Sequence, residues 1–410
     1  MLPAGSPLPD WLAWLETLSP KEIDLGLERV QAVLERLALP LPEHVLLVAG
    51  TNGKGSSVAM ADALLRAAGF SVGAYTSPHI IDYSERIAVR GRQADDAEIV
   101  AAFEKIEAVR DGVPLTYFEY GTLAAWVLFA EAALDVWILE VGMGGRLDAT
   151  NAIEPTGALI TNVSLDHCDW LGEDIETIAV EKAGVMRTDK PAVFGAEKVP
   201  QAIVDHAAKI GAHLLLRDRD YSLDGVPQPG LSGEFQVGNA AAVIALLKAA
   251  GLEAAASDDL VAAVLPTVRV TGRGQSINQD GVEWLLDVAH NPAAAEALAG
   301  TLAAQRGSGA THVIVGMLDD KDIEGSVLAL DEHVDQWIAV TAQSHRAVPA
   351  QELARRIANA CGRPCLIADS LSEAMESARR EASINDRILI TGSFYLVGPA
   401  LKQLYSRPKS

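Results

Sequence analysis

The stretch His44–Ser57, HVLLVAGTNGKGSS, places an apolar run directly before a glycine-rich loop that carries a lysine and two serines. The run His44–Ala49 predicts a buried strand, and Ser56–Ala68 predicts the helix that follows it, with Gly69 at the C-cap position. Glycines in such a loop let backbone N–H groups approach phosphate oxygens at the positive end of the helix dipole. The segment therefore predicts an α/β fold with a phosphate site.

The side chains of this loop support the same interpretation. Lys54 adds a positive charge, and Ser56 has a hydroxyl that can bind Mg²⁺. The loop is not a strict Walker A motif, because Val48 stands where the first glycine is expected and Gly55 separates the lysine from the serine. The alternative is an ordinary glycine-rich turn. The flanking strand, the lysine and the hydroxyls favour the phosphate site.

Further apolar runs, each followed by a helical pattern, alternate along the chain in the manner of βαβ units. A first set comprises Ser71–Thr76, Val136–Val141, Ala158–Val163 and Ala192–Gly195. A second set comprises Glu283–Val288, His312–Gly316, Gln336–Val340, Cys365–Ala368 and Arg387–Ile390.

The segment between the two sets, Leu265–Asp280, is rich in Pro, Gly and Thr, and we interpret it as a domain junction. We therefore expect one domain over residues 1–270 and a second over residues 271–410. Ligands of open α/β sheets bind at the carboxyl ends of the strands, so the default expectation is an active site in the cleft between the domains.

Composition excludes several classes of function. The chain of 410 residues has 33 Lys+Arg against 55 Asp+Glu and a formal net charge of −22, which argues against binding to nucleic acid or to an anionic membrane. No basic residue precedes Lys21, so a secretory signal is not expected, and no apolar run is long enough to span a bilayer. Three cysteines without a disulfide framework fit a reducing compartment. We expect a cytoplasmic protein, by default a monomer.

Polar side chains follow several strands of the first set. Glu140 ends its strand and precedes the glycine-rich loop at 142–151 (GMGGRLDATN), so its carboxylate is a candidate Mg²⁺ ligand; a solvated glutamate is the alternative. Asp166 and His167 follow the next strand, although a lone histidine is more often structural. Lys182, taken alone, would be interpreted as a solvated lysine on a helix.

The second set contains a comparable cluster. The stretch 287–292 (DVAHNP) places Asp, His and Asn at the end of an apolar strand, with a helix expected to start at Pro292. Arg273, in the sequence TGRG of the junction, is placed where it can reach phosphates across the cleft, or it is a solvated linker residue. The stretch 391–394 (TGSF) has the same strand-to-helix context but can be a simple turn.

Taken together, these motifs resemble the Mur-ligase-type amide ligases, and within them the family of bifunctional dihydrofolate synthases/folylpolyglutamate synthases. The matching stretches appear in the order of that family: KEIDLGLERV, VAGTNGKGSS, YTSPHIIDYSERIAV, LTYFEYGTLAAW, ILEVGMGGRLDATN, LDHCDWLG, EKAGVMR, LLDVAHNP, GMLDDKD and TGSF. The resemblance implies an α/β fold, with a P-loop Mur-ligase-type ATPase domain built on a mostly parallel sheet and a smaller Rossmann-like C-terminal domain.

The resemblance also implies a role for individual residues. The residues implied to bind ATP are Asn52, Gly53, Lys54, Gly55, Ser56, Asn239, Arg273 and Asp287. Those implied to bind Mg²⁺ are Ser56, Ser77, Glu140 and His167. Those implied to contact the pteroate are Ile23, Thr116, Tyr117, Phe118, Glu119, Leu147, Asp148 and Ala149. Those implied to be catalytic are Lys54, His290 and Lys182, the last as a carbamate.

The implied reaction is an ATP-dependent ligation. ATP phosphorylates the carboxylate of 7,8-dihydropteroate or tetrahydrofolate, and the amine of L-glutamate attacks the resulting acyl phosphate. Three alternatives stay open: an enzyme that extends folates only, a muramoyl-peptide ligase, and a P-loop nucleotide-binding protein without ligase chemistry. Muramoyl ligases usually carry a nucleotide-sugar domain before the P-loop, whereas 49 residues precede Gly50 in this chain.

Overall fold

The structure, a computed structural model, describes residues 3, 5–19, 24–279, 281–305 and 309–406. Its contacts divide the chain into two compact units. The N-terminal unit comprises Met1–Ser164, Cys168–Pro229 and Val237–Val268. The C-terminal unit comprises Leu165–His167, Gly230–Gln236 and Arg269–Ser410. Each unit is built around its own sheet, and each is described by itself.

The N-terminal unit has an eight-stranded sheet in the order β4-β3-β2-β5-β1-β6-β7-β8. Its strands are β1 (His44–Ala49), β2 (Val72–Tyr75), β3 (Ile87–Val89), β4 (Arg92–Gln93), β5 (Val136–Glu140), β6 (Gly157–Ile160), β7 (Pro191–Phe194) and β8 (His213–Leu216). The six strands from β2 to β8 in this order pair in parallel, whereas β3 and β4 are antiparallel. β1 lies between β5 and β6, which brings the ends of these three strands together.

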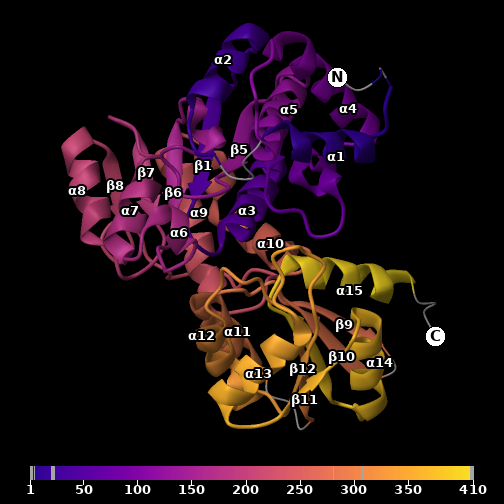
Figure 1. Cartoon of the computed structure of the whole chain (residues 1–410). Coiled ribbons are helices and arrows are strands. Elements are labelled where there is room, and N and C mark those ends of the chain that lie inside the picture. The colour runs from indigo at the N-terminus through magenta and orange to yellow at the C-terminus, as the bar shows by residue number, and fades with distance from the viewer. Residues whose placement is uncertain (1–2, 4, 20–23, 280, 306–308, 407–410) are drawn as a thin grey trace. The chain divides into compact units, whose positions relative to one another are not determined.

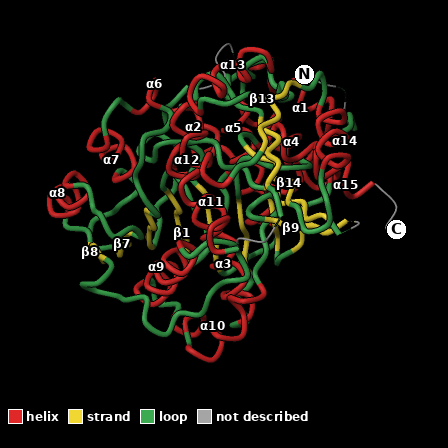
Figure 2. The backbone as a smooth tube through the Cα atoms, turned by 90° about the horizontal axis from the view of Figure 1, so that it is seen from below, coloured by secondary structure: helices red, strands yellow, loops and turns green. Residues whose placement is uncertain are grey.

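Helices cover this sheet. They are α1 (Leu8–Leu18), α2 (Glu28–Leu37), α3 (Lys54–Ala67), α4 (Asp96–Arg110), α5 (Tyr117–Glu131), α6 (Cys168–Leu171), α7 (Ile175–Ala183), α8 (Gln201–Ile210), α9 (Phe235–Ala249) and α10 (Asp258–Val264). Short 3-10 turns are η1 (Tyr83–Arg86), η2 (Ala149–Ala152), η3 (Glu253–Ala256) and η4 (Leu265–Thr267). Figures 1 and 2 both place α7 and α8 beside β7 and β8. Large buried side chains such as Trp11, Trp126 and Trp137 fill the core.

The C-terminal unit has a six-stranded sheet in the order β13-β12-β11-β14-β10-β9. Its strands are β9 (Gln275–Gln279), β10 (Val282–Leu286), β11 (Thr311–Val315), β12 (Gln336–Ala339), β13 (Cys365–Ile367) and β14 (Arg387–Thr391). Only the pair of β9 with β10 is antiparallel within this described sheet. An open, mostly parallel sheet with crossover helices is the Rossmann-like arrangement.

Five α-helices accompany these strands: α11 (Pro292–Ala304), α12 (Ile323–Leu330), α13 (Ala350–Cys361), α14 (Leu371–Glu381) and α15 (Phe394–Ser406). A 3-10 turn, η5 (Asp331–His333), precedes β12. The first three helices pack their buried faces on one side of the sheet, over Val313, Trp337 and Leu389. Figure 1 shows α14 and α15 on the other side.

The sequence predicts the parallel βα core, and the structure confirms the existence of its strands to within a few residues at their ends. The prediction from sequence misses four strands: the antiparallel strands β3, β4 and β9, and the parallel strand β8. β9 lies inside the stretch interpreted as a junction, and its side chains alternate only between half-buried and exposed positions. A strand that buries no side chain fully leaves little hydrophobic periodicity to detect.

Candidate functional site

The loop after β1 has the backbone of an anion-binding turn. β1 ends at Ala49 and α3 begins at Lys54, with Gly53 at the N-cap in a left-handed conformation, φ 85°. The N-cap residue, a glycine, has no side chain to cap this helix, and the first turn contains no acidic residue. The backbone N–H groups of the first turn and the positive end of the helix dipole therefore face a place that suits phosphate.

Side chains at the end of β6 hold the loop in this shape. The hydroxyl of Thr161 donates to the carbonyl oxygen of Asn52 at 2.6 Å, and Asn162 contacts the backbone of Asn52 twice, donating at 3.0 Å and accepting at 3.1 Å. A Cβ atom at Gly50 would lie 1.9 Å from the Thr161 hydroxyl, and the φ of Gly50 is 141°. Only glycine fits at that position.

The residues predicted to bind nucleotide in this unit lie on or beside the loop. The Nζ atom of Lys54 donates to the carbonyl oxygens of Gly50 at 2.9 Å and Thr51 at 3.1 Å, so the ammonium group lies over the loop. Asn239, on α9, is buried; its amide nitrogen would be 2.9 Å from a Cβ atom at Gly53. The structure thus brings Asn239 to the loop, although the two are almost 190 residues apart in the printed sequence.

Two of the predicted metal ligands meet beside the first turn of α3. Glu140, at the end of β5, is 2% exposed, and its Oε2 atom accepts a hydrogen bond from the backbone N–H of Ser77 at 3.1 Å. The same oxygen would lie 3.6 Å from a Cβ atom at Gly55, one residue before Ser56. The solvated alternative for Glu140 is therefore wrong.

The segment that carries Ser77 is fixed from its C-terminal side. The carboxylate of Glu85 accepts hydrogen bonds from three successive backbone N–H groups, those of Ile80, Ile81 and Asp82, at 2.8–2.9 Å. Arg86 donates from Nε to Nδ1 of His79 at 2.9 Å. These contacts order the turn between β2 and η1.

The donor set fits a hard divalent cation. A carboxylate and serine hydroxyls are oxygen ligands of the kind that Mg²⁺ prefers, and Mg²⁺ usually completes its octahedron with water and substrate phosphates. Among the described residues no three His, Cys, Asp or Glu side chains gather to hold a metal ion. His167 belongs to the segment Leu165–His167, which packs with the C-terminal unit.

Two residues predicted to contact pteroate also cap a helix. At the start of α5, the backbone N–H of Thr116 donates to Glu119 at 2.7 Å, and the N–H of Glu119 donates to the Thr116 hydroxyl at 3.2 Å. This is a capping box. Arg29 donates from Nε to both carboxylate oxygens of Glu119, at 3.1 and 3.2 Å. Glu119 is therefore already bound by two partners.

The other predicted pteroate residues surround the loop after β5. The ring of Phe118 lies 5.9 Å from that of Tyr75 and would contact a Cβ atom at Gly142. Asp148 is buried, which raises the pKa of its carboxyl, and it accepts a hydrogen bond from Met143 N–H at 3.0 Å. Other members of the set are Tyr117, which starts α5, and Leu147 and Ala149, which flank Asp148. Ile23 lies outside the described residues.

Lys182 is not a solvated lysine. It lies near the end of α7 and is 3% exposed. The loop after β5 packs on this helix, because the N–H of Arg146 donates to the carbonyl oxygen of Glu181 at 2.8 Å and a Cβ atom at Gly145 would lie 3.1 Å from Cα of Lys182.

In the C-terminal unit, Asp287 joins two of the predicted motifs. Its carboxylate accepts from the N–H of Gly274 at 2.7 Å and the N–H of Ala289 at 2.8 Å. Burial raises the pKa of Asp287, and the positive charge of Arg273 opposes that shift. The TGRG turn and the DVAHNP loop are thus held together at the end of β10.

His290 lies in the same loop, within a buried polar cluster that the sequence predicted only in part. Its Nδ1 atom donates to the carbonyl oxygen of Val288 at 2.8 Å, and its Nε2 atom lies 3.5 Å from Asp166. Asn291 and Lys321 also bind Asp166. Sequence reasoning assigned no role to Asn291 or Lys321; the motif GMLDDKD was the signal that contained Lys321.

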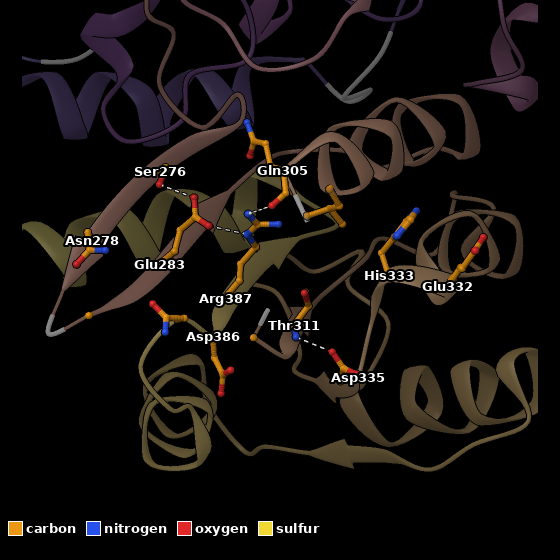
Figure 3. A pocket seen from close by; sticks show the side chains of 14 residues that line it. Ser276, Asn278, Glu283, Gln305, Thr311, Glu332, His333, Asp335, Asp386 and Arg387 are labelled. Carbon is orange, nitrogen blue, oxygen red and sulfur yellow. Dashed lines mark hydrogen bonds and ion pairs between the residues drawn. The ribbon is translucent and has the colours of Figure 1, made fainter. Parts of the chain in front are cut away.

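A separate polar cavity of about 580 Å³ lies at the opposite, amino ends of the C-terminal strands (Figure 3). Glu283 and Arg387 line it and form an ion pair at 2.7 Å. None of the predicted site residues lines it.

Comparisons with known proteins agree with the fold. The model of the Mur ligase middle domain matches residues 48–213, and that of the Mur ligase glutamate ligase domain matches residues 272–394. The class is therefore that of the Mur ligases. More narrowly, the chain belongs to the dihydrofolate synthase/folylpolyglutamate synthase family.

The relatives span the whole chain. It is 41% identical to the dihydrofolate synthase/folylpolyglutamate synthase of Escherichia coli K12, over 98% of this chain and 97% of the relative. It matches the structure of E. coli FolC in complex with DHPP and ADP with a TM-score of 0.93, at 39% identity over 99% and 100% of the two chains. It matches a bifunctional folylpolyglutamate synthase/dihydrofolate synthase with Mn, AMPPNP and L-glutamate bound with a TM-score of 0.90, at 40% identity over 98% and 99%.

No helix in the described part of the chain is both long and apolar enough to cross a membrane.

Proposed function

We propose that the chain is an ATP-dependent amide ligase that joins L-glutamate to 7,8-dihydropteroate, forming dihydrofolate, and to tetrahydrofolate, forming polyglutamates. The proposal depends on the loop at 50–56. Contacts from the end of β6 hold this loop in a shape that suits phosphate, and the loop lies beside the buried carboxylate of Glu140. Relatives that bind ADP, AMPPNP, DHPP and L-glutamate support it.

The phosphates of ATP would bind the backbone of Asn52–Ser56. The loop N–H groups and the first turn of α3 donate to anionic oxygens, and Lys54 supplies a full positive charge. We further propose that the nucleotide contacts Asn239 of the N-terminal unit and Arg273 and Asp287 of the C-terminal unit.

Ser56, Ser77, Glu140 and His167 would hold Mg²⁺. The cation supplies charge neutralisation at the β- and γ-phosphates when it is bound. The buried carboxylate of Glu140 supports this role, because it lies beside the start of α3 and near the backbone of Ser77.

The pteroate would lie against Phe118, Tyr117 and the stretch Leu147–Ala149. Because Glu119 is bound by Arg29 and by the N–H of Thr116, its contribution would be to fix the start of α5 rather than to carry a free charge. Ile23 completes the proposed set and lies outside the described residues.

A carboxylate is a poor electrophile, so the chemistry needs phosphorylation before the amine of glutamate attacks. The enzyme's part is to position the reacting groups and to stabilise the charge that develops on the transferred phosphoryl group. Lys54 would do this at the loop, and His290 would bind the transferred phosphate. Lys182, which is buried, would as a carbamate add an anionic oxygen for the metal.

The test is substrate-dependent release of phosphate. With ATP and Mg²⁺ alone, turnover should be near background; with dihydropteroate and L-glutamate it should rise, and dihydrofolate should form. A nucleotide-binding protein without ligase chemistry would hydrolyse ATP independently of both substrates. Tetrahydrofolate assayed separately tests the second activity, and extension of tetrahydrofolate alone would leave only a folylpolyglutamate synthase. Activity on a UDP-muramoyl substrate instead would identify the muramoyl alternative.

We also propose that the enzyme works as a monomer in the cytoplasm. The three cysteines are free in the structure, in keeping with a reducing compartment. Size-exclusion chromatography with light scattering tests the oligomeric state, and a dimer mass would contradict the proposal.

A further inference from the structure

One carboxylate in the C-terminal unit accepts three hydrogen bonds and also lies close to the ring of His290. Oδ1 of Asp166 accepts from Nζ of Lys321 at 2.6 Å and from the backbone N–H of His167 at 2.9 Å. Oδ2 accepts from Nδ2 of Asn291 at 2.9 Å, and Nε2 of His290 lies 3.5 Å from it. Three separate loops of the chain therefore meet at a single side chain.

The centre of this cluster is buried. The side chains of Asp166 and Lys321 are 7% and 6% exposed, whereas that of His290 is 26% exposed. A buried ion pair seldom adds net stability, because desolvation of the two charges offsets their attraction. What the pair does fix is the position of the groups that contact it.

The contacts of His290 leave its ring little freedom. A carbonyl oxygen and a carboxylate can only accept, so Nδ1 is the donor toward Val288, and Nε2 makes a favourable contact with Asp166 as an N–H donor. The neighbouring Asn291 is fixed at both ends of its amide: Nδ2 donates to Asp166, and Oδ1 accepts from the N–H of Ala294 and so caps α11.

We infer that Asp166 and Lys321 are positioning residues for the ligase reaction, which hold the ring of His290 in the orientation in which it binds the transferred phosphate. Lys321 neutralises Asp166, so that the carboxylate stays buried at the ring. The inference rests on the proposed function. It assigns a role to two residues that would otherwise count as a structural ion pair.

The first experiment measures kcat and KM for ATP in K321M and D166N. Loss of a residue that orients a reacting group typically costs about 10- to 100-fold in rate. We expect a fall of that size in kcat, with the KM for ATP within about twofold of wild type, because the P-loop is not touched. K321R, which keeps the positive charge, should recover most of the rate.

The matched control is R387M. Arg387 and Glu283 form an ion pair in the same unit, with side chains 12% and 30% exposed, at the start of β14 and β10 (Figure 3). We expect this variant to lower the melting temperature of the C-terminal unit and to leave kcat within about twofold of wild type. Equal rate losses in R387M and K321M would show that any lost ion pair lowers the rate, and would overturn the inference.

Two combinations separate positioning from stability. In K321M/D166N no unpaired charge stays buried, so the melting temperature should recover toward that of wild type while kcat stays low. Recovery of kcat together with stability would overturn the inference. In a cycle with H290A, the K321M substitution should cost little further rate once the histidine is absent; rate losses that multiply would also overturn it.

Failure of the proposed function is visible before any variant is made. If the wild-type chain releases no phosphate in response to dihydropteroate and glutamate, the proposed function is wrong. If the wild type is active and the variants behave like R387M, only the positioning role is wrong.

Discussion

Gly50→Ala is the substitution for which the structure gives the clearest magnitude. At a φ of 141° any residue with a Cβ atom is strained, at a cost of about 1–2 kcal/mol. The added Cβ atom would lie 1.9 Å from the hydroxyl of Thr161. That hydroxyl must move away from the carbonyl oxygen of Asn52, which removes a hydrogen bond worth about 1 kcal/mol. The expected loss is about 2–3 kcal/mol of unfolding free energy.

The assay is a double-mutant cycle with Thr161→Ala. Removing the hydroxyl in advance leaves mainly the backbone strain of about 1–2 kcal/mol, so Gly50→Ala should cost about 1 kcal/mol less in that background. Urea unfolding followed by tryptophan fluorescence measures the stability, and calorimetry measures the Kd for ADP. Because the loop must shift, we expect ADP binding about tenfold weaker in the single variant, equivalent to about 1.4 kcal/mol. The same cost in both backgrounds, with unchanged ADP affinity, would refute the reasoning.

Three further predictions concern stability and modification. Thr116→Ala removes one half of the capping box of α5 and should destabilise the N-terminal unit by about 1 kcal/mol, whereas Thr116→Ser should stay near wild type in urea unfolding. Asp386 has a lowered pKa because the backbone N–H groups of Ser383 and Ala310 donate to it. The charged Asp386 carboxylate therefore contributes fully to the free energy of unfolding above about pH 4, the pKa of an aspartate in the unfolded chain. Asp386→Asn should lower the melting temperature at pH 7, and the gap to wild type should narrow as the pH falls below 4. Finally, ¹³C-labelled bicarbonate should give a carbamate NMR resonance in wild type that is absent from Lys182→Arg; the same resonance in both proteins would place the carbamate elsewhere.

Much of the fold could be predicted from sequence because its parallel strands are buried on both faces. β1, β5 and β14 each contain a continuous apolar run, and such runs can be recognised in the sequence alone. The strands that were missed carry exposed or half-buried side chains, as in β4 and β9. Their pairing depends on neighbours that local periodicity does not show.

The residues of the candidate site are likewise of two kinds, those within one local segment and those brought to it from elsewhere in the chain. The P-loop is local, so its residues could be found from spacing alone. The residues that contact the loop are distant from it in the sequence. Thr161 and Asn162 lie beside it because β1 pairs with β6, and Asn239 lies beside it because of the position of α9. The burial of Lys182 depends on a loop that begins 40 residues earlier in the printed sequence. Contacts of this kind are properties of the topology, and no pattern within one segment encodes them.

The net charge of −22 is the remaining difficulty for an enzyme whose proposed substrates are all anions. The helix termini show how a chain with a large negative charge can still bind anionic substrates. Most α-helices in the described part of the chain have an acidic residue in the first turn, where it stabilises the positive end of the dipole. The helices without one are α3, α8, α9, α11 and α15.

Of these five, α8 receives a carboxylate from outside itself, because Glu176 accepts from the N–H groups of Gln201 and Ala202 at its first turn. Three of the other four, α3, α11 and α15, begin within the motifs VAGTNGKGSS, DVAHNP and TGSF. Acidic residues are thus absent from the first turns of three helices that start within a motif, although other motifs, such as LTYFEYGTLAAW, start helices that carry one. Because a dipole end acts only over its first turn, an acidic protein can keep several anion-binding positions so long as its carboxylates are placed at other helix starts. The overall negative charge of the chain, which argues against polyanionic partners, therefore does not exclude small anionic ligands at such helix starts.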